Sequence, residues 1–282
     1  MTVAKIAALC GALVLSGCTR LGFDDSATVR ADTRVDTRVD SGALDVPLAE
    51  DSNGPGGPEG GGGGQDLGDA ATVDAVMPPQ QQGLANHYGF EGSLQNGVAG
   101  ASPILVLRGS PNYIAGLLGT GLRLLAGACM KLPAIHPTMS YALWFRTTEV
   151  GPPATLWHEG SAIIDAELCG NPPDGDWGLA LADNKLMMIG TRSPAPINDG
   201  KWHALVFTHD GASTHFDVYI DGSYAFSGAT VKVYSFAGVP WVGLGCNPCN
   251  AEGGKVTIDV DELRVYQRVL GEAEIKALST PP

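Results

Sequence analysis

Short apolar segments separated by Gly, Pro, Asn and Asp run from His87 to Tyr266, and their side chains alternate with the period of a β-strand. The clearest example is the stretch from Asn198 to Gly222, where Asp199-Gly200 and Asp221-Gly222 flank two runs rich in aromatic and β-branched residues. Because Asp-Gly steps tolerate the positive φ of tight turns, this stretch predicts a β-hairpin. Its first strand carries apolar residues on both faces, which favours a strand covered on both sides.

The same patterning predicts an all-β domain of many short strands. Strands at such close spacing are typical of a sandwich or a barrel. Glu272 to Leu278 favour a short terminal helix, which Pro281-Pro282 would stop. The predicted strands lie near residues 86–91, 104–108, 121–125, 128–132, 138–147, 154–159, 161–167, 177–182, 185–190, 202–209, 214–221, 223–227, 239–244 and 256–266.

The first eighteen residues have the pattern of an export signal. Lys5 supplies a positive start, and the apolar run Ile6 to Val14 is too short to span a bilayer. Leu15-Ser16-Gly17-Cys18 resembles a bacterial lipobox, and this resemblance implies cleavage before Cys18 and lipidation of that residue. The alternative is an ordinary secretory signal in which Cys18 is incidental.

Charge and glycine content change sharply along the 282 residues. Residues 19–82 hold four basic and twelve acidic residues and a glycine-rich run from Gly54 to Gly64. They lack the apolar content to form a core, so we predict a disordered acidic tether. The net charge of the whole chain is −13, and an acidic surface repels phosphate, which argues against a nucleic-acid partner.

These boundaries predict three parts: a signal peptide at residues 1–17, a lipidated N-terminus and tether at residues 18–82, and a folded domain at residues 83–282. A lipid on Cys18 would anchor the domain to the membrane of the cell envelope. Thr19, which is not acidic, favours the outer membrane by analogy with known sorting signals.

Four segments of the domain occur in an order that is similar to a known family. They are Tyr88 to Gly92, Tyr141 to Thr147, the Asp-Gly-Lys-Trp-His step at residues 199–203 with its hairpin, and Asp261 to Leu270. Together they resemble the laminin-G-like jelly roll of the concanavalin A-like lectin/glucanase superfamily over roughly residues 84–280. The resemblance implies an all-β fold, a two-sheet antiparallel jelly-roll sandwich with a short C-terminal helix. It implies no particular activity.

Aromatic residues are the candidates for contact with a sugar ring. Trp144 and Trp202 lie in alternating strands and are predicted to fill the core. Trp177 and Trp241 stand beside turn-forming residues and, with Tyr224, are candidate ligand-binding residues. The alternative for both of these tryptophans, and the one that the sequence favours, is packing in the core.

Four cysteines follow the signal: Cys129, Cys169, Cys246 and Cys249. In an exported protein an even number favours disulfides, and three pairings are open. We favour a bond from Cys169 to Cys246 or Cys249, because these residues lie in turn-rich segments. The Cys246-Asn247-Pro248-Cys249 step lacks the context of a redox helix or of a zinc site.

Two sets of acidic residues are candidate calcium ligands, because Ca²⁺ prefers hard oxygen atoms. The resemblance supports this, since relatives often carry calcium at a loop rim or near the termini. Solvated loop acids are the alternative. The two sets are Asp165, Asp174 and Asp176 around Cys169, and Glu91, Asp259 and Asp261 from the two ends of the domain.

Motifs of enzymes are missing from the sequence. No Glu-x-Asp pair of the glucanase type occurs, nor a Gly-x-Ser-x-Gly, a His-Glu-x-x-His or a phosphate loop. Asp165 and Glu167, two positions apart, remain as a cryptic carboxylate pair. We therefore predict that the chain is not an enzyme.

The sequence as a whole predicts a membrane-anchored surface lipoprotein that displays a non-catalytic jelly roll. Its partner would be a glycan or a protein. One alternative is a structural or adhesive envelope protein without a small-molecule site. A second is a glycoside-active enzyme that uses the cryptic carboxylate pair.

Overall fold

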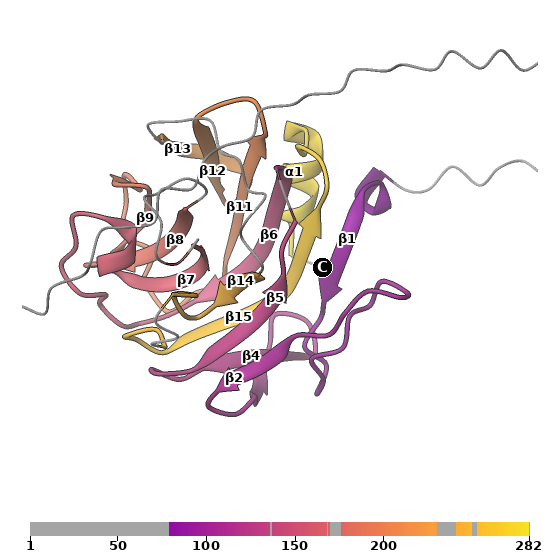
Figure 1. Cartoon of the computed structure of the whole chain (residues 1–282), viewed down its shortest axis with the longest axis horizontal. Coiled ribbons are helices and arrows are strands. Elements are labelled where there is room, and N and C mark those ends of the chain that lie inside the picture. Colours follow the sequence, from indigo (N-terminus) through magenta and orange to yellow (C-terminus); the bar gives the residue numbers. More distant parts are fainter. Residues whose placement is uncertain are drawn as a thin grey trace, which may run out of the picture. The chain divides into compact units, whose positions relative to one another are not determined.

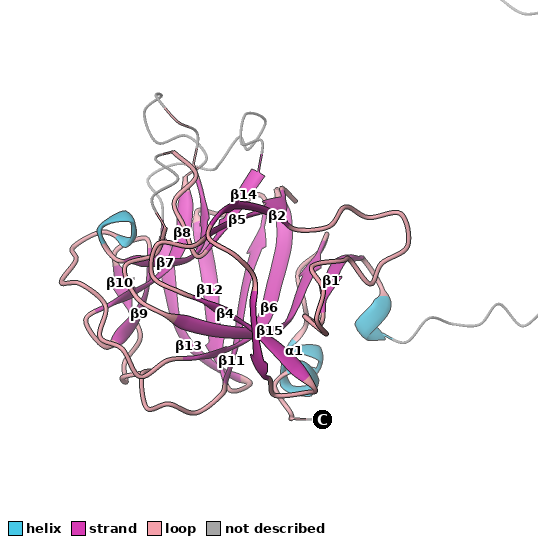
Figure 2. Cartoon of the chain, turned by 90° about the horizontal axis from the view of Figure 1, so that it is seen from below, coloured by secondary structure: helices cyan, strands magenta, loops and turns pink. Residues whose placement is uncertain are grey.

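The computed structural model describes residues 79–135, 137–167, 169, 176–229, 241–249 and 253–281. These residues form two antiparallel β-sheets and a short C-terminal helix (Figures 1 and 2). Within them, no helix has the length and apolar character needed to cross a membrane. The predicted signal peptide, Cys18 and the predicted tether lie outside the described residues.

The larger sheet, called sheet A, has β15 and β6 near its middle. Strand β1 joins it by pairing with the second half of β15. Its strands, in order across the sheet, are β13 (Ser223–Ala229), β12 (His215–Ile220), β11 (His203–Asp210), β6 (Thr138–Arg146), β15 (Ile258–Tyr266), β4 (Thr120–Leu124) and β3 (Asn112–Ala115), with β1 (Leu84–Tyr88) outside this order.

The second sheet, called sheet B, packs against sheet A. Its strands, in order, are β10 (Thr191–Arg192), β9 (Lys185–Met188), β8 (Trp177–Ala182), β7 (Ser161–Ala166), β14 (Trp241–Leu244), β5 (Cys129–Pro133) and β2 (Leu105–Arg108). The remaining elements are the 3₁₀ turns η1 (Pro79–Gln81) and η2 (Trp157–Glu159) and the helix α1 (Glu272–Leu278).

The predicted hairpin is confirmed by β11 and β12, which pair with Leu205 opposite Ile220. Asp221 and Gly222 have φ angles of 51° and 79°, as a tight turn into the next strand requires. The strand predicted at residues 154–159 is wrong, because this segment contains η2. The Glu159 carboxylate accepts hydrogen bonds from the preceding backbone N–H groups and so closes a turn.

The core lies between the inner faces of the two sheets. At its centre Trp177 of sheet B contacts Tyr141 and Phe207 of sheet A, with ring centroids 5.5 and 5.3 Å apart. All three side chains are fully buried. Large aromatic rings from both sheets therefore supply much of the apolar area that holds the sandwich closed.

Helix α1 covers part of the outer face of sheet A, beside β6 and β15 (Figure 1). Its Ile275 packs with Ala142 of β6 and Val206 of β11, which point away from the core. This confirms the prediction that the first strand of the hairpin is covered on both faces.

Two disulfides join distant parts of the domain. Cys129 of β5 is bonded to Cys246, which follows β14, and Cys169 is bonded to Cys249. The second bond confirms the favoured prediction for Cys169 and selects Cys249 as its partner. Each bond closes a long loop in the unfolded chain, which favours the folded state.

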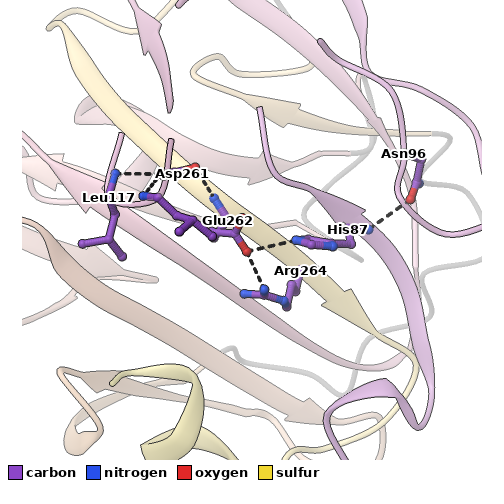
Figure 3. Close-up of polar contacts among 7 residues, drawn as sticks. His87, Asn96, Leu117, Asp261, Glu262 and Arg264 are labelled. Carbon is purple, nitrogen blue, oxygen red and sulfur yellow. Dashed lines mark hydrogen bonds and ion pairs between the residues drawn. The ribbon is translucent and has the colours of Figure 1, made fainter. Parts of the chain in front are cut away.

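The first and last strands are joined by charged side chains (Figure 3). Glu262 of β15 accepts a hydrogen bond from His87 of β1 at 3.0 Å and contacts Arg264. These hydrogen bonds and the charge of Arg264 lower the pKa of Glu262. Glu262 has a φ of 50° where the register of β15 with β6 shifts, so that two residues, Asp261 and Glu262, separate the inward-facing Val260 and Leu263. Asp261 accepts a hydrogen bond from the N–H group of Leu117.

Candidate functional site

A row of polar side chains crosses the outer face of sheet A, away from the residues that α1 covers. Strand register places Arg123 of β4 opposite Asp259 of β15, and Asp259 opposite Arg146 of β6. Trp202 directly precedes β11. Because His203 pairs with Phe145 in antiparallel register, the next pair along would place Trp202 opposite Arg146. The sheet thus brings together residues up to 136 positions apart in the chain.

The side chains of this row hold one another in place. Asp259 accepts hydrogen bonds from Nε and Nη2 of Arg123 at 2.7 and 3.0 Å, and from Nε and Nη2 of Arg146 at 2.9 and 2.7 Å. The Arg146 guanidinium lies 4.4 Å from the centroid of the Trp202 ring, within cation–π range. Both arginines are therefore held in defined orientations before any ligand arrives.

An open cleft of about 250 Å³ lies over the charged residues of this row, next to Trp202. Gly200, at its rim, has a φ of 79°, and a Cβ there would come within 3.0 Å of the Thr148 methyl group. A glycine at this position keeps the rim open. The cleft is lined by Arg123, Arg146, Thr147, Thr148, Glu149, Gly200, Thr257 and Asp259.

Burial differs strongly among the charged groups of the cleft. The Asp259 side chain is 5% exposed, whereas those of Arg123 and Arg146 are 41% and 28% exposed. Hydrogen bonding to Asp259 raises the pKa of Arg123, so that its guanidinium stays protonated. The buried Asp259 carboxylate thus holds the two arginines in place, while the arginines are partly exposed to solvent and can contact a ligand.

The three aromatic residues that the sequence suggested as ligand contacts do not form one site. Trp177 is fully buried between the sheets, which corrects its predicted binding role and confirms its alternative, packing in the core. Trp241 lies in sheet B, partly exposed, with Lys131 5.7 Å from its ring centroid. Tyr224 lies in sheet A, is 58% exposed and hydrogen-bonds Ser227.

The other two predictions about tryptophans have different outcomes. Trp144 is buried, as predicted, but on the outer face of β6, since it alternates with Leu143 and Phe145, which point into the core. Trp202 is only partly buried and lies outside the core, so the prediction that it fills the core is wrong. The reason is that side chains alternate along a strand. Leu205 and Phe207 point inward, and Trp202, an odd number of positions from each, lies on the outer face.

Glu91 and Asp261, two of the predicted calcium ligands, both hold the loop between β3 and β4. Glu91 accepts hydrogen bonds from the N–H and hydroxyl groups of Thr120. Asp261 accepts from the N–H groups of Leu117 and Leu118. Asp259, the third member of this set, belongs to the arginine row instead. Calcium at this set stays a prediction.

Asp165, in the other predicted set, lies inside the protein. It is fully buried and accepts hydrogen bonds from Trp157 Nε1 at 3.4 Å and Asn247 Nδ2 at 3.2 Å. Burial and the nearby charge of Glu167 raise the pKa of Asp165 well above its usual range, which favours the protonated acid. Asp176 contributes to the same rise, and Asp174 lies outside the described residues.

In the described part of the chain, no three His, Cys, Asp or Glu side chains are grouped to hold a metal ion.

Arg123 and Arg146 were not singled out from the sequence. A signal for them exists, because each alternates with residues that point into the core, Leu122 and Leu124 in one strand and Phe145 in the other. A charged residue at an outer-face position of a strand is ordinary by itself. Only the register of three strands shows that these charges meet around Asp259.

Comparison with protein families matches residues 129–276 to the family model described as the concanavalin A-like lectin/glucanases superfamily. The match covers more than half of the chain. Among curated proteins, no sequence matches this one.

Several solved structures share the architecture. Domain 4 of AbnA, a GH43 extracellular arabinanase from Geobacillus stearothermophilus, in complex with arabinotriose, is 21% identical with a TM-score of 0.55, covering 70% of this chain and 98% of that domain. The binding domain of Paraclostridial Mosquitocidal Protein 1 is 14% identical with a TM-score of 0.53, covering 71% and 52%. The binding domain of Botulinum Neurotoxin DC in complex with SialylT is 11% identical with a TM-score of 0.53, covering 72% and 52%. At such identities the likeness shows the fold, and it confirms the predicted jelly-roll sandwich.

Proposed function

Because the chain belongs to the concanavalin A-like lectin/glucanases superfamily, we propose that its folded domain is a non-catalytic module that binds a carbohydrate. We place the binding site in the cleft over Arg123, Asp259 and Arg146. The single observation that carries this proposal is the row of arginines held by a buried carboxylate beside a partly exposed tryptophan.

The chemistry of the cleft suits a ligand rich in hydroxyl groups. Guanidinium N–H groups donate hydrogen bonds, and the carboxylate of Glu149 and the hydroxyl of Thr148 accept them. Trp202 adds an apolar ring surface next to these polar groups. A few fixed polar groups beside an aromatic ring are typical of sites for small polar ligands.

The comparisons support a glycan as the ligand class. The arabinanase domain was solved in complex with arabinotriose, and one toxin binding domain was solved in complex with SialylT. These ligands belong to those proteins. For this chain they favour an oligosaccharide over a nucleotide or a peptide, but the identity of the sugar is open to experiment.

A binding role fits the carboxylates of the cleft better than a catalytic one. Glycoside hydrolysis needs a carboxylic acid that gives a proton and a second carboxylate that acts as base or nucleophile. Asp259 is 5% exposed, and both of its oxygens accept hydrogen bonds from arginine side chains. It is therefore poorly placed to reach a glycosidic bond.

The test is a glycan array with the full chain, followed by calorimetry on each glycan that binds. We expect Trp202→Ala to weaken binding at least about fivefold, since loss of a stacking surface is worth roughly 1 kcal/mol or more. Tyr224→Ala, which removes an exposed ring from another part of sheet A, is the matched control. Binding that is lost in the Tyr224 variant and kept in the Trp202 variant would move the site out of the cleft.

Two further arms of the screen test companion predictions. Running it with about 1 mM calcium and again with EGTA shows whether calcium supports folding or binding, because a ligand of the folded state raises its melting temperature. Product analysis of the same mixtures reveals any hydrolysis. Release of reducing ends by the pure protein would favour the enzyme alternative.

We also propose that the export signal directs the protein out of the cytoplasm and that lipidated Cys18 anchors the module to the bacterial cell envelope. The support is the sequence of the signal and its lipobox. Cys18→Ser is expected to move the protein from the membrane fraction to the soluble fraction after export. A variant that stays in the membrane fraction would contradict the anchor without bearing on the cleft.

A further inference from the structure

The two arginines of the cleft are paired with only one of its two carboxylates. Residues 83–282 hold twelve basic and eighteen acidic residues, yet Arg123 and Arg146 share a single buried partner, Asp259. One carboxylate neutralises only one of the two guanidinium groups. Glu149 also lines the cleft and is exposed, so that solvent screens its charge more than that of the buried Asp259. The space directly over the two arginines therefore favours an anion.

Each arginine keeps donors available for a ligand. Asp259 engages Nε and Nη2 of both side chains. Among the described residues, neither Nη1 group has a hydrogen-bond partner, although both side chains line the cleft. A guanidinium that is partly exposed and already oriented can donate to a planar oxyanion with little further loss of side-chain entropy.

Fixed orientation distinguishes this pair from ordinary surface arginines. Arg146 is held by Asp259 from one side and stacks on Trp202 from another. Arg123 is held by both oxygens of the same carboxylate. Arg123 and Arg146 lie on the two strands that flank β15, each opposite Asp259, so the sheet fixes the distance between the arginines. This arrangement is a rigid receptor for one negatively charged group.

We propose that the cleft selects acidic glycans, whose oxyanion is the carboxylate of a uronic acid or a sulfate ester, over neutral ones. This inference rests on the proposed carbohydrate-binding function and adds the ligand class. In the bound state the oxyanion lies over Arg123 and Arg146 and accepts from their Nη1 groups. The hydroxyl groups of the sugar reach Thr148 and Glu149 at the rim.

The first experiment compares ligands on the unaltered full chain by calorimetry. The probes are a neutral oligogalactan, an oligogalacturonate of the same length, a sulfated oligogalactan and sodium sulfate alone. We expect an acidic oligosaccharide to bind at least about tenfold more tightly than the neutral one, as charge-assisted hydrogen bonds allow. Preference between the second and third probes identifies the oxyanion. Sodium sulfate that binds as tightly as either of them would overturn the proposal, since the sugar would then contribute nothing.

Salt supplies a second readout that needs no variant. Raising sodium chloride from about 0.1 M to about 1 M shortens the Debye length from roughly 10 Å to roughly 3 Å. The affinity for the acidic probe is expected to fall severalfold, while that for the neutral probe stays nearly constant. Equal responses of the two probes would contradict an electrostatic preference.

Variants locate the preference in the cleft. Arg146→Gln and Arg123→Gln are each expected to reduce the affinity for the acidic probe at least about tenfold and that for the neutral probe much less. Arg192→Gln, the matched control, removes the same charge outside the cleft, where Arg192 pairs with Asp183. A control that loses as much affinity as the cleft variants would mean that the effect comes from net charge.

The failure of this inference can be told from the failure of the proposed function. If neutral glycans bind as tightly as acidic ones, the module binds carbohydrate and the acidic preference is wrong. If the folded chain binds none of the oligosaccharide probes or array glycans, the proposed function itself fails. Melting curves of each protein, recorded beside the calorimetry, show which variants are folded.

Discussion

Trp177 and Trp202 begin in similar sequence settings and end in opposite parts of the molecule. Each follows an Asp-Gly step in the sequence and stands at, or directly before, the start of a strand. Trp177 is fully buried between the sheets, whereas Trp202 lies partly exposed on the outer face, under the Arg146 guanidinium. The comparison teaches that the parity of a residue within its strand, more than its type, decides whether a ring points between the sheets or lies on the outer face.

The same division separates the two faces of sheet A. The inner face of β6 carries Tyr141, Leu143 and Phe145, which pack in the core. Its outer face carries Ala142 under α1 and Arg146 in the cleft. Mutations on the inner face should therefore change stability, and mutations at the cleft end of the outer face should change binding.

The largest effect is expected from Trp177→Ala. Removing a fully buried ring leaves a cavity between the sheets and should lower the free energy of unfolding by about 3–5 kcal/mol. Urea denaturation of the two proteins gives this difference. A loss below about 1 kcal/mol would mean that the core is not organised around this ring.

The next largest effect, an increase in stability, is expected from Asp165→Asn. Burial and the charge of Glu167 raise the pKa of Asp165, so its contribution to stability is present below its unfolded pKa and is lost as the pH rises through the folded pKa. Asn is uncharged like the protonated acid and keeps one acceptor oxygen, for the Asn247 amide at 3.2 Å, so it should raise the melting temperature at pH 7 by about 2–4 °C, or roughly 1 kcal/mol. The gap between the two proteins should widen as the pH rises above the ordinary pKa of an aspartic acid, about 4.

Asp199→Asn is the matched control for this pH dependence. The N–H group of Lys201 and the His203 ring lower the pKa of exposed Asp199 to about 2. Its contribution is present above its unfolded pKa and is lost as the pH falls, which is the reverse of Asp165. If both variants shift the melting temperature in the same direction at pH 7, the buried carboxyl is not the source of the effect.

The smallest effect on stability is expected from Trp202→Ala. The variant loses a cation–π contact at a partly exposed site, worth about 0.5–1 kcal/mol, and some apolar burial. Thermal melting beside Trp177→Ala measures the contrast directly. Equal losses in the two variants would show that Trp202 supports the fold as much as the core tryptophan does, and would remove the reason to treat it as a binding residue.

The charged residues of β15 show why the site was harder to predict than the fold. Sequence reasoning placed Glu91, Asp259 and Asp261 together as calcium ligands, because the fold could bring the two ends of the domain together. In the folded domain Asp259 turns to Arg123 and Arg146, and Asp261 accepts from the loop after β3. The hydrogen-bond partner of a carboxylate on a strand depends on the register of the neighbouring strands. That register cannot be predicted from a local sequence pattern.

The sequence by itself determined the all-β class, the order of most strands, the terminal helix and the turns at Asp199-Gly200 and Asp221-Gly222, because these follow from local alternation, propensity and backbone conformation. Only the tertiary structure decided that Cys169 pairs with Cys249 and that Arg123, Asp259, Arg146 and Trp202 share one row. Those contacts join strands far apart in the chain, and long-range register is selected by the packing of the whole sandwich rather than by any single segment.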